Sequence, residues 1–252
     1  MIPKIIHYCW LSGDPFPESI QRCLDSWNMV LKDYEIWLWD TSRFDVDSLF
    51  WTSEAFKNRK YAFAADYIRL FALYNYGGIY LDSDVFVYKS FDDLLGLPYF
   101  IGEDYVHCFE PAVIGVTKGC KWIKQIMEMY NDRHFVRADG SFDYYGLPRV
   151  FHDMLVDNYS FRLVASKDDV KYQDDCINIF PFDYFNSRDY VGAKRYPNSY
   201  CSHNYLGSWM EHQPIMKSII KRIVPRSVLN LYYKSVYKNN RESLGQVQIP
   251  VR

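Results

Sequence analysis

Apolar and aromatic residues along the first hundred positions form short strand-like runs that alternate with longer runs of helical spacing. Residues 4–10 are a short β-prone run followed by a turn-forming stretch, and residues 34–39 are a second, aromatic-rich run. Between them, the segment 18–31 carries apolar side chains at helical spacing: Ile20, Leu24, Trp27 and Leu31. The order strand, helix, strand predicts the start of an α/β fold.

The next elements continue this alternation. We expect a helix over 53–59 and a longer one over 61–76, which Gly77 and Gly78 would end as C-cap residues. The run 79–87 is an apolar strand interrupted by two carboxylates. The predicted fold class is therefore α/β, a Rossmann-like, mainly parallel sheet flanked by helices.

The pattern weakens after the first hundred residues. We expect further strands between 99 and 116, a helix over 120–130, and an irregular, aromatic and charged region that extends to about residue 208. No internal repeat or low-complexity segment is present in this region.

The C-terminal segment has a different character. Between residues 217 and 241 it contains no acid and seven basic residues: Lys217, Lys221, Arg222, Arg226, Lys234, Lys238 and Arg241. Apolar residues are interleaved with them, which favours basic amphipathic helices. These helices either contact a membrane surface or pack on the domain with a solvated basic face. We therefore divide the chain into a domain over 1–213 and a small helical extension over 214–252.

Composition and charge exclude several classes of protein. With 49% hydrophobic and 19% aromatic residues, the 252-residue chain can bury a substantial core and is not disordered. Its net charge of -2 argues against nucleic acid as a partner. Six cysteines without a CxxC pair, an N-terminus unlike a signal peptide and the lack of a long apolar run indicate a cytoplasmic protein with reduced thiols.

Asp82 and Asp84 are the strongest candidates for chemistry. They follow an apolar strand at alternate positions, which would direct both carboxylates to one side at the edge where α/β folds bind ligands. Such a pair suits Mn²⁺ or Mg²⁺, and the cation could bind a diphosphate leaving group. The alternative is a polar exit from a strand whose acids cap a turn or face water.

Asp66 and Arg69 lie in the apolar stripe of the preceding predicted helix. Unpaired burial of either charge would be costly. They form either an i,i+3 ion pair at the edge of the core or a ligand site, in which Arg69 would bind a phosphate and Asp66 a sugar hydroxyl.

Two segments in this order resemble glycosyltransferase family 32. They are IPKIIHYCWLSG (2–13) and AFAADYIRLFALYNYGGIYLDSDV (62–85), with weaker similarity in YYGLP (144–148) and HNYLGSW (203–209). The family is found in bacterial capsular polysaccharide enzymes and is related to yeast mannosyltransferases and the clostridial glucosylating toxins. The resemblance implies a GT-A fold, a nucleotide-sugar donor, a divalent metal and retention of the anomeric configuration.

The resemblance also implies roles for individual residues. Asp84 matches the direct metal ligand and Asp82 the acid that reaches the donor and, through water, the metal. His203 matches a side chain that completes the metal site. With Arg69, the two aspartates would carry catalysis, and the residues expected at the donor are Trp10, Asp66, Arg69, Tyr80, Asp82, Gly146, Ser208 and Trp209.

Several of these assignments keep a structural alternative. Trp10 would stack on the donor base or pack at a strand end, and Tyr80 would line the nucleotide pocket or pack in its strand. Gly146 and Pro148 match a Gly-Pro turn near the donor sugar, although here Leu147 separates the two. No nucleophile is identified. Glu103 and Asp104 are candidates for acceptor contacts, and a solvated loop explains them equally well.

The resemblance thus implies a retaining hexosyltransferase. It would move a hexose or N-acetylhexosamine from a UDP-sugar to a surface oligosaccharide, with a lipid-linked acceptor and peripheral contact with the inner face of the cytoplasmic membrane as further expectations. One alternative is a haloacid-dehalogenase-type phosphatase, with Asp82 as nucleophile and Asp168-Asp169 or Asp174-Asp175 as its later acidic pair. The other is a non-catalytic sugar-binding module.

Overall fold

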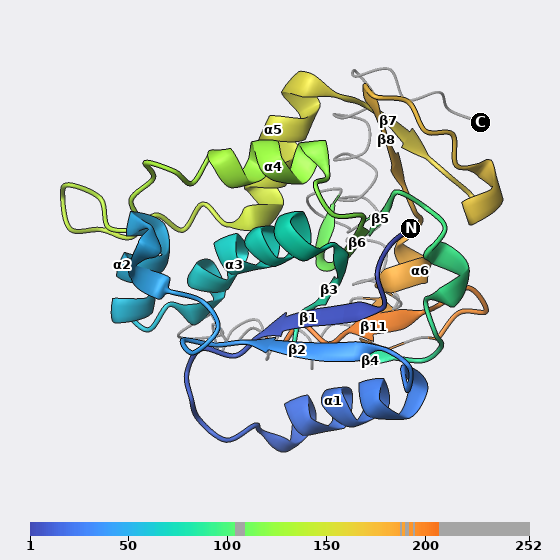
Figure 1. The fold of residues 1–252 in the computed structure, drawn as a ribbon, viewed down its shortest axis with the longest axis horizontal. Coiled ribbons are helices and arrows are strands. Elements are labelled where there is room, and N and C mark those ends of the chain that lie inside the picture. The colour runs from blue at the N-terminus through green and yellow to red at the C-terminus, as the bar shows by residue number, and fades with distance from the viewer. Residues whose placement is uncertain (104–108, 187, 190–191, 194, 207–252) are drawn as a thin grey trace, which may run out of the picture.

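A five-stranded sheet forms the centre of the computed structural model, which describes residues 1–103, 109–186, 188–189, 192–193 and 195–206 (Figure 1). Its strands, in spatial order, are β2 (Glu35–Trp39), β1 (Ile5–Cys9), β3 (Gly78–Leu81), β6 (Glu110–Val116) and β5 (Tyr99–Gly102). Strands β2, β1 and β3 are parallel, and β6 is antiparallel to both of its neighbours. Four of the five strands thus run in one direction, and the predicted mainly parallel α/β sheet is confirmed.

Helices cover both faces of this sheet. One face carries α1 (Glu18–Val30), and the opposite face carries α2 (Phe50–Lys57), α3 (Tyr61–Tyr76), α4 (Lys121–Glu128) and α5 (Leu147–Asn158) (Figure 1). Side chains alternate between the two faces, as in any strand. In β3, Tyr80 joins the core under α3, whereas Ile79 and Leu81 join the core under α1.

The remaining described elements are short. Outside the main sheet, the strand pairs are β4 (Val85–Val87) with β11 (Cys201–His203), β7 (Ser160–Leu163) with β8 (Cys176–Ile179), and β9 (Arg188–Asp189) with β10 (Gly192–Ala193). The helical turns are η1 (Val46–Ser48), η2 (Asp92–Leu94), η3 (Lys167–Asp169) and α6 (Phe182–Phe185).

Gly77 and Gly78 make the sharp turn between α3 and β3, as predicted. Both have positive φ, +68° and +104°. A Cβ on Gly78 would lie 2.6 Å from the carbonyl oxygen of Ile5, and one on Gly77 would lie 2.6 Å from the amide nitrogen of Lys118. Glycine is required at both positions because the backbone conformation and the close approach of neighbouring backbone, from Lys118 at Gly77 and from β1 at Gly78, exclude a side chain.

Most of the predicted elements are present, and two expectations need correction. The helix expected over 53–59 begins earlier, at Phe50. The region expected to be irregular contains α5, whose Pro148 lies in the first helical turn after the N-cap Gly146, so the expected Gly-Pro turn is a helix start. The pattern did contain this helix, because apolar side chains recur there at helical spacing: Leu147, Val150, Phe151, Met154 and Leu155.

Candidate metal and donor site

Asp82, Ser83 and Asp84 form a turn between β3 and β4 rather than the end of one continuous strand. The Asp82 amide donates to the carbonyl of Ala112, and the Val85 amide donates to the carbonyl of Asp82. The chain thus leaves the main sheet at Leu81 and enters the small β4–β11 sheet at Val85. The two carboxylates are held at the boundary between these sheets.

His203 reaches this turn because β11 pairs with β4. In the antiparallel register, His203 lies opposite Val85. Its Nε2 lies 3.1 Å from Asp84 Oδ1 and 3.9 Å from Asp82 Oδ2. One ligand atom from each of the three residues lies within 4.8 Å of the others. The structure therefore brings together the three residues predicted as the metal site.

The chemistry of this group fits a divalent cation. Two carboxylates and one imidazole offer the oxygen and nitrogen ligands that suit Mn²⁺, and the carboxylates alone suit Mg²⁺. Asp84 is further fixed because its Oδ2 accepts the Leu206 amide at 2.9 Å and its carbonyl accepts the Asn204 amide at 3.1 Å. A metal bound here would be held by a turn that these two hydrogen bonds fix.

The pKa values around His203 reveal excess negative charge. Burial alone would lower the pKa of His203, but the carboxylates of Asp84 and Glu110 raise it well above its usual value. Burial raises the pKa of Asp82. In contrast, burial would raise the pKa of Asp84, but the charge of His203 and its hydrogen bond hold it below the ordinary value. A position that favours a proton this strongly also favours another cation.

Arg69 and Asp66 extend the site on α3. Arg69 is 5% exposed; its Nη2 lies 2.9 Å from Asp82 Oδ1, and its Nη1 donates to the Pro111 carbonyl at 2.6 Å. The i,i+3 contact with Asp66 is longer, at 3.8 Å. Both terminal nitrogens of Arg69 thus bind protein oxygens, so the arginine is placed to hold Asp82, and direct contact with a donor phosphate stays a prediction.

Asp66 has an unusual environment for a carboxylate. Burial raises its pKa to about 7, although Arg69 opposes this shift. Its Oδ2 accepts the Leu147 amide at 3.1 Å. The Cβ of a residue replacing Gly146 would lie 4.0 Å from the same oxygen. The predicted residues Asp66 and Gly146 are therefore neighbours, although they lie far apart in the sequence.

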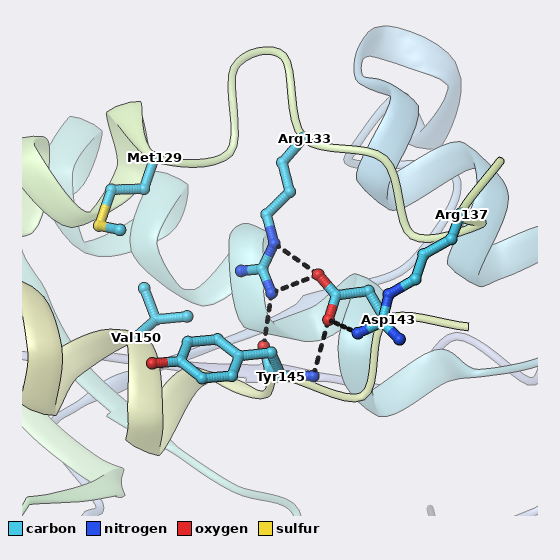
Figure 2. A pocket seen from close by; sticks show the side chains of 6 residues that line it. All are labelled: Met129, Arg133, Arg137, Asp143, Tyr145 and Val150. Carbon is cyan, nitrogen blue, oxygen red and sulfur yellow. Dashed lines mark hydrogen bonds and ion pairs between the residues drawn. The ribbon is translucent and has the colours of Figure 1, made fainter. Parts of the chain in front are cut away.

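The segment just before Gly146 is held by side chains that line a hollow beside α4 and α5 (Figure 2). Asp143 binds Arg133 through Oδ2 at 2.8 Å and Arg137 through Oδ1 at 3.1 Å. The Tyr145 amide donates to Asp143 Oδ1, and the Tyr145 carbonyl accepts Arg133 Nη2 at 2.7 Å. Both backbone groups of Tyr145 are thus clamped, which fixes the chain just before Gly146 and Leu147.

The aromatic residues expected at the donor differ in exposure. Trp10 follows β1, is partly exposed, contacts Phe16 with a centroid distance of 5.0 Å and donates Nε1–H to the Asp14 carbonyl at 2.8 Å. Its exposed surface remains available for stacking. Tyr80 is 1% exposed, and the Arg69 guanidinium lies 4.4 Å from its ring centroid. The structure favours the packing alternative for Tyr80, because its ring supports Arg69.

The structure describes only some of the other residues expected at the site. Ser208, Trp209, Asp104 and the 214–252 extension lie outside the described residues. Glu103 is buried rather than solvated, and its amide donates to the Phe180 carbonyl at 2.9 Å.

Two residues of the site were missed by the sequence analysis. Glu110 begins β6 and is 3% exposed, and its Oε1 lies 3.4 Å from His203 Nδ1. Burial would raise the pKa of Glu110, but His203 keeps it below its usual value. The ring of Tyr205 packs on that of His203 with a centroid distance of 4.0 Å. An acid opening an otherwise apolar strand was a signal for Glu110, but the sequence did not show which residue it meets.

The arrangement expected of a phosphatase is not formed. None of the acids in the two candidate pairs belongs to the metal-ligand group around Asp82. Asp168 and Asp169 lie on η3, which has no buried residue, and the side chain of Asp174 is 97% exposed. A later acidic pair facing Asp82 is therefore absent from the described residues, which argues against this alternative.

Part of the chain matches a known family of glycosyltransferases. Residues 17–101 match the family described as "Glycosyltransferase sugar-binding region containing DXD motif". This match confirms the resemblance seen in the sequence. The turn from Asp82 to Asp84 lies within the matched segment and carries its DXD motif.

Individual relatives share this region. Inositol phosphoceramide mannosyltransferase 3 of Schizosaccharomyces pombe is 34% identical over 134 residues, which cover 50% of this chain and 36% of the relative. Mannosyl phosphorylinositol ceramide synthase SUR1 of Saccharomyces cerevisiae is 36% identical over 108 residues, which cover 40% of this chain and 27% of the relative. The chain thus spans about a third of these relatives.

Among solved structures, the PaToxG glycosyltransferase superposes with a TM-score of 0.46 at 20% identity, over 62% of this chain and 68% of that one. The apo form of the glycosyltransferase GlyE of Streptococcus pneumoniae TIGR4 superposes with a TM-score of 0.43 at 15% identity, over 100% of this chain and 66% of that one. The similarity to glycosyltransferases therefore rests on the family match and not on these distant superpositions.

The described part of the chain contains no helix with the length and apolar content needed to cross a bilayer.

Proposed function

We propose that this chain is a metal-dependent, retaining glycosyltransferase that uses a nucleotide sugar, with a UDP-sugar as the preferred donor. The observation that carries the proposal is the group formed by Asp82, Asp84 and His203, whose ligand atoms lie within 4.8 Å of one another inside a DXD glycosyltransferase region. Retention of configuration rests on the family resemblance.

Some of the site residues would bind the ion, and others would contact the donor. Asp84, Asp82 and His203 would hold Mn²⁺ or Mg²⁺, which supplies positive charge to the diphosphate leaving group when bound. The 2.9 Å contact with Arg69 orients Asp82 and opposes the rise in its pKa that burial causes. These four side chains would act by positioning the reacting groups and by stabilising charge.

The donor's sugar and base would lie on either side of this centre. Asp66 lies beside the backbone at Gly146 and Leu147 and next to Arg69, and its carboxylate suits a sugar hydroxyl. The partly exposed face of Trp10 suits stacking on the base. Ser208 and Trp209 would then close over the donor, as the resemblance implies.

The proposed sugar and acceptor rest on the similarity to the curated relatives. The notable relatives are mannosyltransferases that act on inositol phosphoceramide, so mannose becomes the first hexose to test and a lipid-linked saccharide the first acceptor. Hexoses and N-acetylhexosamines in general, and surface oligosaccharides such as capsular polysaccharide, remain within the proposal. A peripheral contact of the basic segment 214–252 with anionic lipid would bring the enzyme to such an acceptor.

Calorimetric titration tests the donor site. UDP, UDP-sugars and nucleotide-activated mannose would be titrated with and without Mn²⁺ into the wild type and the Asp84→Ala and Asp25→Ala variants. Asp25 is the control, because it is an exposed acid on α1 whose side chain binds only its neighbour Gln21 in the described structure. We expect metal-dependent binding that is lost in Asp84→Ala and kept in Asp25→Ala. Absence of binding by any nucleotide would overturn the proposed function, and binding by another nucleotide alone would overturn the preference for UDP.

A further inference from the structure

Glu110 is a carboxylate at a buried position, where packing alone would favour an apolar residue. It opens the fully buried strand β6 and is itself 3% exposed. A buried carboxylate is costly unless its oxygens are bound. Its Oε2 accepts Asn186 Nδ2 at 3.0 Å and the Tyr205 hydroxyl at 2.7 Å, and its Oε1 accepts the Ala112 amide at 3.1 Å. Three donors therefore fix the carboxylate before His203 is considered.

The fixed carboxylate faces one nitrogen of His203, and the DXD turn faces the other. Glu110 Oε1 lies 3.4 Å from Nδ1, whereas Nε2 lies 3.1 Å from Asp84 Oδ1. The imidazole is also held against rotation, because the ring of Tyr205 packs on it at 4.0 Å and the hydroxyl of the same tyrosine binds Glu110. Nδ1 of His203 thus faces Glu110 and Nε2 faces the aspartates. A ring in this position that keeps its proton on Nδ1 would present the lone pair of Nε2 to a cation bound beside the aspartates.

We infer that Glu110 is a positioning residue that orients His203 as a ligand for the divalent cation. The inference rests on the proposed function, since it assumes the metal site of Asp82, Asp84 and His203. A histidine ligand usually donates its second ring N–H to a carboxylate or carbonyl, and loss of that partner weakens metal binding about 10- to 100-fold. Tyr205 acts with Glu110, because it contacts both partners of this pair.

The test is Mn²⁺ binding by the full chain, measured from the electron paramagnetic resonance signal of free Mn²⁺ without any nucleotide. We expect Glu110→Ala to weaken binding about 10- to 100-fold. Glu110→Gln keeps an oxygen that can accept the Nδ1 proton and should lose clearly less. Asn178→Ala is the matched control, because Asn178 is an equally buried polar residue that binds Tyr99 and Lys171 instead of the site. Thermal unfolding would establish that each variant is folded.

A double-mutant cycle separates positioning from a direct effect of charge. If Glu110 acts through His203, Glu110→Ala should cause no further loss in a His203→Ala background. An equal loss in both backgrounds would overturn the inference, as would a folded Glu110→Ala variant that binds Mn²⁺ as the wild type does. Absence of Mn²⁺ binding by the wild type would instead overturn the metal site itself, and this inference with it.

Discussion

Arg69 Nη2 and Asp82 Oδ1 lie 2.9 Å apart, and this contact joins the long helix α3 to the DXD turn. The side chain of Arg69 is 6% exposed and that of Asp82 27%. The same guanidinium also binds the Pro111 carbonyl of the neighbouring strand β6. One buried cation therefore ties three segments of the site together.

Replacement of Arg69 by an uncharged residue should lower the stability of the protein and impair its function. In Arg69→Met, Asp82 and the Pro111 carbonyl would lose their partner in a buried place, which typically costs about 3–5 kcal/mol. Urea unfolding measures this loss. Arg137→Met is the control, because its ion pair with Asp143 is 56% exposed on the arginine side and should contribute less than about 1 kcal/mol. Equal losses in the two variants would show that burial of the Arg69 pair is unimportant.

The glycine at the start of β3 should tolerate no side chain. Gly78→Ala would combine an unfavourable φ with a Cβ 2.6 Å from the Ile5 carbonyl, at an expected cost of about 3 kcal/mol or more. Gly13→Ala shares the positive φ but has open space, and should cost about 1–2 kcal/mol. Chemical denaturation compares the two. A smaller loss for Gly78→Ala than for Gly13→Ala would contradict the close approach of β1 and β3.

His7 should make stability depend on pH. It is fully buried; Trp39 Nε1 donates to its Nδ1, and its Nε2 lies 2.7 Å from the Gly77 carbonyl, an arrangement that needs the neutral ring. Burial lowers its pKa to about 4. Between about pH 6.5 and 4 the unfolded chain therefore binds the proton more readily than the folded chain does. The free energy of unfolding should decrease by up to about 3 kcal/mol as the pH is lowered through this range.

Comparison with His7→Gln isolates this contribution. Glutamine can both donate and accept, but it does not titrate. The unfolding free energy of the wild type should decline more steeply below about pH 6.5 than that of His7→Gln. Parallel curves for the two proteins would contradict a neutral, buried His7.

A methyl group at Gly146 should separate donor binding from folding. Its backbone has ordinary φ, and a Cβ there would meet Phe63 at 3.7 Å and Asp66 Oδ2 at 4.0 Å, both normal contacts. Gly146→Ala should thus unfold within about 1 kcal/mol of the wild type. If the donor sugar lies beside Asp66, the methyl group should weaken nucleotide-sugar binding about 10-fold or more while binding of the free nucleotide is kept.

The control for this variant is Gly96→Ala, because Gly96 has no neighbour within 4 Å of an added Cβ and lies in a turn away from Asp66. Calorimetry with the nucleotide and the nucleotide sugar on both variants makes the comparison. Unchanged affinity of Gly146→Ala for the nucleotide sugar would place the donor sugar elsewhere.

The basic segment beyond residue 213 should bring the protein to anionic membranes. Each basic residue near such a surface contributes about 1 kcal/mol, so the seven between 217 and 241 should retain the full chain on anionic liposomes at low salt. In flotation experiments, a chain ending at Gln213 should remain unbound, and neutral liposomes should retain neither form. Equal recovery of the two forms on anionic liposomes would favour surface helices packed on the domain.

The first hundred residues were predictable because local patterns decide their structure. The bounds of α3 and its glycine end follow from helical spacing and conformational preference. The resemblance added the identity of His203 as the third ligand. These features lie close together in the sequence or in a recognisable order.

The rest of the site depends on contacts that a single sequence does not encode locally. Glu110 and His203 meet only because β6 and β11 pair with strands on either side of the DXD turn. Likewise, the contact of Asp66 with the Leu147 amide depends on where α5 begins beside α3. Tertiary pairing, rather than residue type, selects these partners.

The pairing of β11 with β4 also sets the order in which the site can be completed during folding. Strand β4 adjoins the DXD turn, whereas β11 comes from a segment far downstream, so His203 arrives only after nearly the whole described chain has been synthesised. Earlier intermediates could form the sheet and the aspartate turn but not the three-ligand group. An ion held by all three residues would therefore bind the finished fold and stabilise it, because ligands that bind only the native state shift the folding equilibrium toward it.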